Sequence, residues 1–183
     1  LTDVRVPMAN RVGEENKGWT YAKYLLQHER SGTAGVANSK AQINRLKKIA
    51  ARERAGGRFL IDDPDFRRQI AEVEIELQAL EYTDLRYVMT AASGQPVGAE
   101  TSMLKLRGTE IQQRISELLM QAMGPYALPY LPEAMEYGWN EDPVGPAVAP
   151  PLAPAYFNKR KTSIYGGSNE IQRDILAKMV LGL

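Results

Sequence analysis

The sequence contains no cysteine and a single histidine, His28. The chain therefore cannot form a disulfide, a thiol nucleophile, a zinc–thiolate site or a multi-histidine metal site. Lys and Arg number 23 against 22 Asp and Glu, a net charge of +1, which lacks the basic excess that attracts nucleic acid or anionic membranes. It also lacks an apolar run of about 18 residues and a signal-peptide pattern. We expect a cytoplasmic protein without metal, nucleic-acid or membrane binding.

The 183 residues, 44% hydrophobic and 25% charged, are enough for one domain with a sizeable core. Near the start, Val4 to Pro7 alternates apolar and polar residues, which predicts a short strand. A lone strand is not stable, so we expect the rest of its sheet to lie outside this sequence. We therefore predict that residues 1–17 are the end of a preceding β-domain and a connector, and that residues 18–183 form a helical domain.

Apolar residues recur at steps of three and four over most of the chain, a spacing typical of α-helices. The pattern predicts one helix from Gly18 to about Arg54 and a second from Pro64, capped by Asp63, to about Ser93 with a stripe that includes Leu85. A third is expected from about Val97 to Met123 and a last one after Ser168. This pattern predicts an all-α fold, an up-and-down four-helix bundle with a long irregular loop before the last helix.

The predicted loop, residues 124–158, holds eight of the eleven prolines. Irregular segments of this length are uncommon in compact domains and are often functional or disordered. Six aromatic residues in this loop favour packing against another surface, because disordered segments contain few aromatics.

Glu29 is the most informative single residue, because it falls on the apolar arc of its predicted helix, with Ala22, Leu25 and Val36. A carboxylate there must be paired, or else its pKa rises until it can act as a base near neutral pH. From the pattern alone, pairing with a Lys or Arg from elsewhere in the fold remains the alternative.

The segment Gly166-Gly167-Ser168 comes directly before the last predicted helix. A glycine turn at a helix amino terminus offers free N–H groups and the positive end of the helix dipole, which suit a cofactor. A plain helix start would look the same.

Two blocks at opposite ends of the chain resemble one family. Residues 163–177 read SIYGGSNEIQRDILA and resemble the closing motif of acyl-CoA dehydrogenases, and residues 4–7 and 13–19, VRVP and GEENKGW, resemble that family's passage from the middle β-domain into the carboxyl-terminal helical domain. The run LQHER at 26–30 and the long loop are most similar to the large subunit of pimeloyl-CoA dehydrogenase.

The resemblance implies FAD-dependent oxidation of an acyl-CoA to its trans-2-enoyl-CoA, as in fatty acid β-oxidation. A carboxylate removes the α-proton while the β-hydrogen leaves as hydride to the flavin. Many members carry this base directly before the second glycine of the closing motif, where this sequence has Gly166. A minority carry it at the position that matches Glu29, which is therefore the expected base, with Arg30 beside it ordering the active site.

The resemblance also implies flavin contacts from Gln121, Gly124, Gly167, Ser168 and Glu170. The family's Arg-x-Thr-Phe-Gly element, which reaches the FAD of a neighbouring subunit, is degraded here to RERAGG at residues 52–57.

The implied partners are an acyl-CoA substrate, an electron-transferring flavoprotein as acceptor, and further subunits in a homo- or hetero-oligomer built through the helical bundle. The long loop is expected to shape either the acyl pocket or a subunit interface. Alternatives are a non-catalytic subunit that completes a partner's FAD site, an acyl-CoA oxidase and an enoyl-CoA reductase, and we expect this fragment alone to be inactive.

Overall fold

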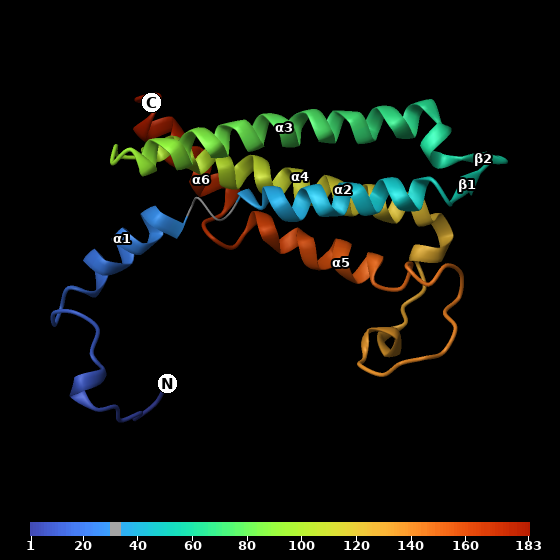
Figure 1. The fold of residues 1–183 in the computed structure, drawn as a ribbon. Coiled ribbons are helices and arrows are strands. Elements are labelled where there is room, and N and C mark those ends of the chain that lie inside the picture. Colours follow the sequence, from blue (N-terminus) through green and yellow to red (C-terminus); the bar gives the residue numbers. More distant parts are fainter. Residues whose placement is uncertain (30–33) are drawn as a thin grey trace.

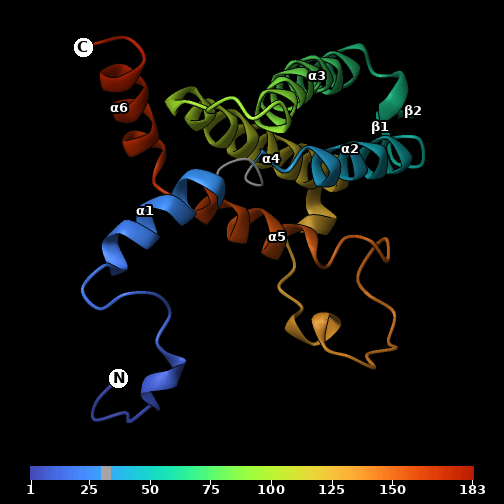
Figure 2. The same ribbon diagram turned by 60° about the vertical axis from the view of Figure 1, so that its left-hand side comes forward.

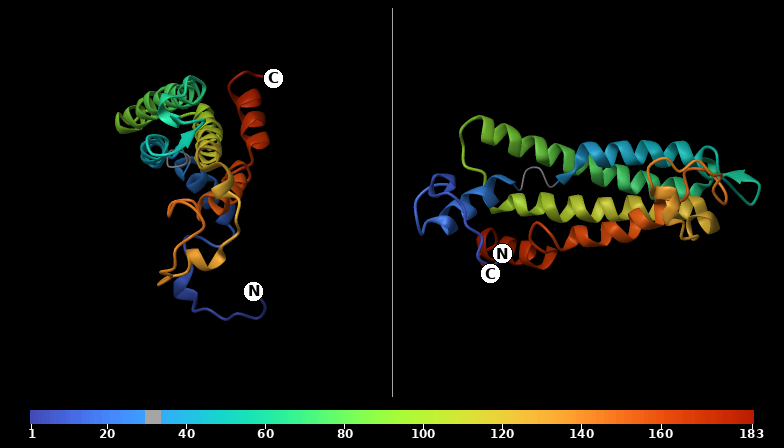
Figure 3. Two further views of the ribbon diagram at one scale, coloured as in Figure 1. Left: turned by 90° about the vertical axis from the view of Figure 1, so that its right-hand side faces the viewer. Right: turned by 90° about the horizontal axis from the view of Figure 1, so that it is seen from below.

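A computed structural model describes residues 1–29 and 34–183, with the backbone alone for residues 26–29 and 100. Its α-helices are α1 (Gly18–Glu29), α2 (Val36–Ala50), α3 (Pro64–Ala92), α4 (Ser102–Met123), α5 (Leu152–Lys159) and α6 (Asn169–Met179). Helix α4 is central, because it packs against α2, α3, α5 and α6 (Figures 1 and 3). The all-α prediction is confirmed.

The core lies between α2, α3 and α4, where each helix contributes one apolar stripe. Fully buried side chains run along the length of α4, such as Leu104, Ile111 and Leu118. The facing stripes consist of Ile43, Leu46 and Ile49 on α2 and of Phe66, Ile70, Val73, Leu77 and Leu80 on α3. Burial of these side chains, at roughly 1.5–3 kcal/mol each, is the main force that holds the three helices together.

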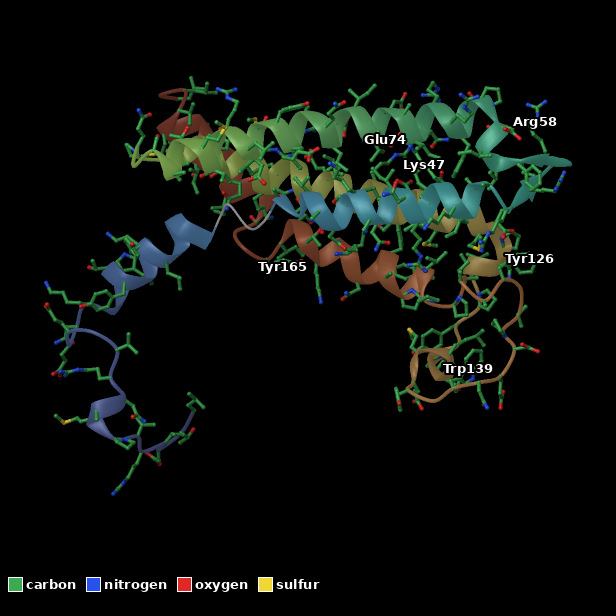
Figure 4. All side chains as sticks on the ribbon, viewed as in Figure 1. Lys47, Arg58, Glu74, Tyr126, Trp139 and Tyr165 are labelled. Atoms are coloured by element: carbon green, nitrogen blue, oxygen red, sulfur yellow. The ribbon has the colours of Figure 1, made fainter. Side chains whose placement is uncertain are left out.

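Helix α3 begins where the sequence predicts, because the Asp63 carboxylate accepts a hydrogen bond of 2.8 Å from the backbone N–H of Phe66 and Pro64 occupies the first turn. Along its length, Glu74 accepts a 2.6 Å bond from Lys47 of α2 (Figure 4). The apolar stripe is shorter than predicted, however. Leu85 was expected in it but is 49% exposed, because the second half of α3 extends beyond the buried stripe.

The single helix predicted from Gly18 to Arg54 is wrong, since two helices occupy this range. Helix α1 ends at Glu29, and α2 begins after Gly35, whose φ of 62° is left-handed and cannot continue a right-handed helix. Helix α1 then diverges from the bundle, as Figures 1 and 2 show.

The segment Val4–Pro7 is not paired as a strand within the described chain and leads into a short 3₁₀ turn at Met8–Asn10. Since the sheet was expected to lie outside this sequence, the strand stays a prediction. The strands in the described chain are β1 (Arg54–Ala55) and β2 (Arg58–Phe59), an antiparallel pair. Gly56 and Gly57, both at positive φ, form the two-residue turn between them.

The predicted irregular segment 124–158 ends earlier than expected, because its last part is α5. The remainder contains short 3₁₀ turns at Gly124–Ala127 and Pro132–Met135 and projects from the bundle (Figure 1). The Tyr126 ring lies directly against Gly145, where an added Cβ would come within 2.3 Å of the ring. This one contact braces the loop, whereas Tyr130, Tyr137 and Phe157 are 79%, 108% and 67% exposed, so the predicted packing of the aromatics against another surface is not found within the described chain.

Candidate functional site

The glycine turn before α6 has a specific backbone shape. Gly166 and Gly167 have φ values of 66° and 82°, which side-chain-bearing residues rarely adopt. The Gln172 side-chain amide donates a 3.3 Å hydrogen bond to the Gly166 carbonyl, and a Cβ on Gly167 would lie 2.2 Å from that same amide nitrogen. Gly167 is therefore required by its positive φ, and any side chain there would also displace the end of the Gln172 side chain, whereas a Cβ on Gly166 would meet nothing within 4 Å.

Ser168 and Glu170 stand at the amino end of α6. The Ser168 hydroxyl caps the helix by accepting a 3.3 Å bond from the backbone N–H of Ile171. The pKa of Glu170 is lowered by hydrogen bonds from its own backbone N–H and from Ser168, and further by the cations Arg173 and Lys105. Glu170 is exposed and is therefore an anion at neutral pH that can accept hydrogen bonds.

A buried cation lies beneath this turn, and sequence reasoning missed it. Lys105 of α4 is 2% exposed, and its ammonium donates a 2.7 Å hydrogen bond to Oδ1 of Asn169. The Thr109 hydroxyl bonds to the same oxygen at 3.3 Å. Thr101, Lys105, Gly108 and Thr109 recur at helical spacing, but a polar face of this kind predicts contact with solvent, so the sequence carries no local signal for the burial of Lys105.

The exposed side of the contact between α4 and α6 carries a chain of ion pairs. Arg173 of α6 pairs with Glu110 at 2.9 Å, Glu110 also pairs with Arg107, and Arg107 reaches Glu76 of α3 at 3.3 Å. These residues are about half exposed, so each pair contributes little to stability. They link the surfaces of α3, α4 and α6 but restrain α6 only weakly.

The expected base, Glu29, is the last residue of α1. Its backbone is described but its side chain is not, and Arg30 lies outside the described residues. The apolar arc predicted around Glu29 is not found: Leu25 is 64% exposed, Trp19 on the same helix is 71% exposed, and Val36 belongs to α2 and not to the same helix. Helix α1 leaves the bundle, so this arc does not face the bundle core of the described chain. Helix α1 and α6 lie at the same end of the bundle (Figures 1 and 2), so the candidate base and the glycine turn share that end.

The other predicted flavin contacts lie at the opposite end of α4. Gln121 is exposed and Gly124 follows the helix with a φ of 54°. Gln121 is sixteen residues beyond Lys105, or about 24 Å at 1.5 Å per residue. In Figure 4, Tyr165, next to the glycine turn, lies on the side of the bundle toward α1, and Tyr126, two residues after Gly124, lies toward the other end. The structure thus divides the predicted site residues into two groups.

The β1–β2 hairpin lies at the same end of the bundle as Gln121 and Gly124 (Figure 1). It overlaps residues 52–57, the stretch that the resemblance matches with the family's Arg-x-Thr-Phe-Gly element. The Arg54 guanidinium lies 3.7 Å from the centre of the Phe59 ring and donates a 2.7 Å bond to the Gly57 carbonyl. This arginine is therefore held by its own hairpin, and Arg58 beyond the turn is exposed (Figure 4).

A cavity of about 220 Å³ lies between α2, α4 and α5. Its lining combines apolar residues such as Leu119 and Leu152 with Arg45 and Lys159. The buried hydroxyl of Ser39, another lining residue, has no hydrogen-bond partner. Nothing in the sequence singled out this cavity, and it lies apart from both groups of predicted site residues.

The described residues contain no cluster of His, Asp or Glu that could hold a metal ion. Within the same ranges, no helix has the length and apolar content needed to cross a bilayer.

Known proteins resemble the chain over its whole length. Acyl-CoA dehydrogenase FadE26 of Mycobacterium tuberculosis is 29% identical over 100% of this chain and 44% of its own length. A chain in the crystal structure of the ChsE4–ChsE5 complex, also from M. tuberculosis, superposes with a TM-score of 0.75 at 29% identity, covering 99% of this chain and 45% of that one. An acyl-CoA dehydrogenase from Geobacillus kaustophilus gives 0.77 at 26% identity over 99% of this chain and 43% of that one.

The chain therefore spans less than half the length of these relatives. The family model described as "Acyl-CoA dehydrogenase, C-terminal domain" matches residues 16–181, which include all five α-helices of the bundle, α1 and the glycine turn. On that match, the chain belongs to the acyl-CoA dehydrogenase C-terminal domain family.

Proposed function

We propose that this chain is the carboxyl-terminal domain of an FAD-dependent acyl-CoA dehydrogenase, with residues 1–17 leading in from a preceding β-domain. The family match over residues 16–181 carries the proposal. The common end of α1 and α6 supports it, because the reaction needs a base and a cofactor contact close together (Figure 2).

In this proposal Glu29 is the general base. Its carboxylate takes the proton from the α-carbon of the acyl thioester, while the β-hydrogen leaves with its electron pair and the trans-2-enoyl thioester forms. Bound FAD supplies the acceptor for that hydride. The α-proton of a thioester is weakly acidic, so the carboxylate must be held in a site that excludes water. Arg30, next in the chain, helps to order that site.

The residues of the glycine turn fit a flavin. Gly166 leaves open space where a side chain would stand, and α6 directs the positive end of its dipole at the turn. Ser168 offers a hydroxyl, and the anionic Glu170 accepts hydrogen bonds but cannot donate them. Glu170 therefore suits hydroxyl or N–H groups of the cofactor and would repel its phosphates.

Gln121 and Gly124 belong to a second flavin site in this proposal, because about 24 Å of helix separates them from the glycine turn. Each cofactor would then contact two subunits, and the degraded hairpin weakens what this chain can offer at the second site. We infer an oligomer formed through the helical bundle, with a different subunit as partner. The matching chain from the ChsE4–ChsE5 complex supports a heteromeric form. An electron-transferring flavoprotein would reoxidise the flavin.

The long loop bears on the choice of substrate. It projects from the end of the bundle remote from α1 (Figures 1 and 3), which favours a role in a subunit interface over one in the acyl pocket of this same chain. The sequence also resembles the large subunit of pimeloyl-CoA dehydrogenase. On that resemblance we predict a dicarboxylyl or otherwise bulky acyl-CoA as substrate.

The test is Glu29→Gln in the full-length, flavin-loaded protein, assayed for acyl-CoA-dependent reduction of an electron acceptor. Loss of a general base lowers kcat by about 100-fold or more, with acyl-CoA binding retained. Glu72→Gln on the exposed face of α3 is the matched control and should keep full turnover. Undiminished turnover of Glu29→Gln would instead favour a non-catalytic subunit that completes a partner's site.

A rescue experiment sharpens this test. Gly166 stands where most of the family carries the base, and space is open there for a side chain. Adding Gly166→Glu to Glu29→Gln should recover part of the lost turnover, limited by the positive φ at that position. Peroxide formation in air, measured alongside, distinguishes a dehydrogenase from an oxidase.

A further inference from the structure

Lys105, in the first turn of α4, is an unusual residue to find buried between two helices. It lies on α4 between Leu104 and Leu106 and is 2% exposed. Burial lowers the pKa of its ammonium, and the carboxylate of Glu170 counters that effect. A buried cation is costly, and apolar residues of similar volume often serve stability as well or better. Its presence calls for a role that Leu or Met could not fill.

The contacts of Lys105 point to the start of α6. The ammonium donates to Asn169 Oδ1 at 2.7 Å across 64 positions of sequence. Asn169 is 6% exposed and lies between Ser168 and Glu170 in the chain. The neighbouring Thr109 hydroxyl is 3.3 Å from the same oxygen, so two groups on α4 converge on one atom of α6.

This arrangement ties the first turn of α6, directly after the glycine turn and the Ser168 cap, to α4. Gly166 and Gly167 are flexible residues at positive φ, and the Ser168 cap and the exposed ion pairs of Arg173 are weak restraints. The bond from Lys105 is the buried, charge-assisted restraint on the first turn, a class of bond that contributes more than a neutral one. Gln172, one turn later and 3% exposed, packs under Gly167 and completes the support.

We propose that Lys105 is a positioning residue that, through Asn169, holds Ser168 and Glu170 in place for the flavin. The role at the flavin rests on the function proposed above, whereas the support of the turn does not. Lys105 itself touches no reacting atom in this account.

The experiment uses Lys105→Met in the full-length protein, which keeps the side-chain length but removes the donor. Hydrogen exchange of the backbone amides in residues 166–172 measures the support of the turn. We expect exchange there to rise about tenfold or more, since a hydrogen bond to a charged group is lost. Flavin affinity should fall by a similar factor and the visible flavin spectrum should shift, with exchange in α2 and α3 unchanged.

Three further single variants and one double variant make the result specific. Lys178→Met removes an exposed lysine of the same length on α6, where it pairs with Asp174, and should change neither readout. Lys105→Gln keeps a donor and should restore part of the protection. Asn169→Ala should reproduce the effect from the other side of the bond, and the double variant with Lys105→Met should be no worse than either single one. If Lys105→Met does not fold, Asn169→Ala and Lys105→Gln carry the test.

The outcomes distinguish the support of the glycine turn by Lys105 from the role of that turn at the flavin. Increased exchange with reduced flavin affinity supports both the positioning role and the flavin site. Increased exchange with unchanged flavin affinity and spectrum keeps the support of the turn but overturns its assignment to the flavin. Unchanged exchange in both Lys105→Met and Asn169→Ala overturns the positioning role itself.

Discussion

Gly108 marks the closest approach of two backbones in the bundle, and Gly108→Ala tests that packing. Gly108 is buried on α4, and an added Cβ would lie 2.5 Å from the carbonyl oxygen and 2.9 Å from the Cα of Ala34. Both are backbone atoms, so no side chain can rotate away. Overpacking of this kind costs about 2–3 kcal/mol, and the higher helix propensity of Ala offsets about 1 kcal/mol. We expect a net loss of about 1–2 kcal/mol.

Chemical denaturation of the full-length protein measures this loss as a lower midpoint with an unchanged denaturant slope. Gly18→Ala at the start of α1 is the matched control, because its Cβ would meet nothing within 4 Å, and it should change the free energy of unfolding by no more than about 0.5 kcal/mol. A Gly108→Ala protein as stable as wild type would refute the claim that α4 and Ala34 are in rigid backbone contact.

Three other substitutions test separate parts of the fold by the same unfolding measurement. Asp63→Ala removes the cap of α3 and should lower the free energy of unfolding by about 1 kcal/mol. Asp65→Ala, beyond the cap, should lower it by less. Equal losses in the two variants would contradict the capping role of Asp63. Ile111→Ala, in the core at 0% exposure, should cost about 2–5 kcal/mol, while Ile75→Ala at 68% exposure should be nearly neutral. Burial raises the pKa of Asp84, whose Oδ1 has no hydrogen-bond partner. The folded state therefore favours the protonated form of Asp84, so the free energy of unfolding of the wild type should fall as the pH rises from the pKa of an ordinary aspartate to the raised value. Asp84→Asn should remove that dependence. A variant with the same pH profile as the wild type would contradict the role of Asp84.

Local signals in the sequence predict much of the bundle. The pair Asp63 and Pro64 predicts the start of α3 because a side-chain cap and a fixed φ act within one turn. Ser168 predicts the start of α6 for the same reason. The apolar stripes of α2, α3 and α4 follow from the helical period, and these stripes define the core.

Features that depend on distant contacts were not predictable in this way. The break before α2 depends on the left-handed Gly35, and a glycine in a helical pattern is otherwise only a modest cost. Helix α5 was hidden by Pro151 and Pro154, which the first turn of a helix tolerates. The burial of Lys105 arises from the packing of α6, 64 residues along the chain, and a single lysine in a helical pattern predicts a solvated face.

The candidate site also has one part that the sequence predicts and one part that it does not. The closing motif predicts the glycine turn and the cap that follows it, and the structure contains both. The resemblance also grouped Gln121 and Gly124 with that turn, but the length of α4 sets them at the other end. Only the geometry reveals that separation, because sequence motifs carry no information about which end of a bundle they occupy.

The most direct test of the central claim is a single-turnover experiment on the full-length, flavin-loaded protein without oxygen. Acyl-CoA is mixed with the wild type and with Glu29→Gln, and the visible absorbance of oxidised flavin is followed. The account predicts rapid bleaching in the wild type and bleaching at least about 100-fold slower in the variant. Equally fast bleaching in both proteins would contradict the assignment of Glu29 as the base.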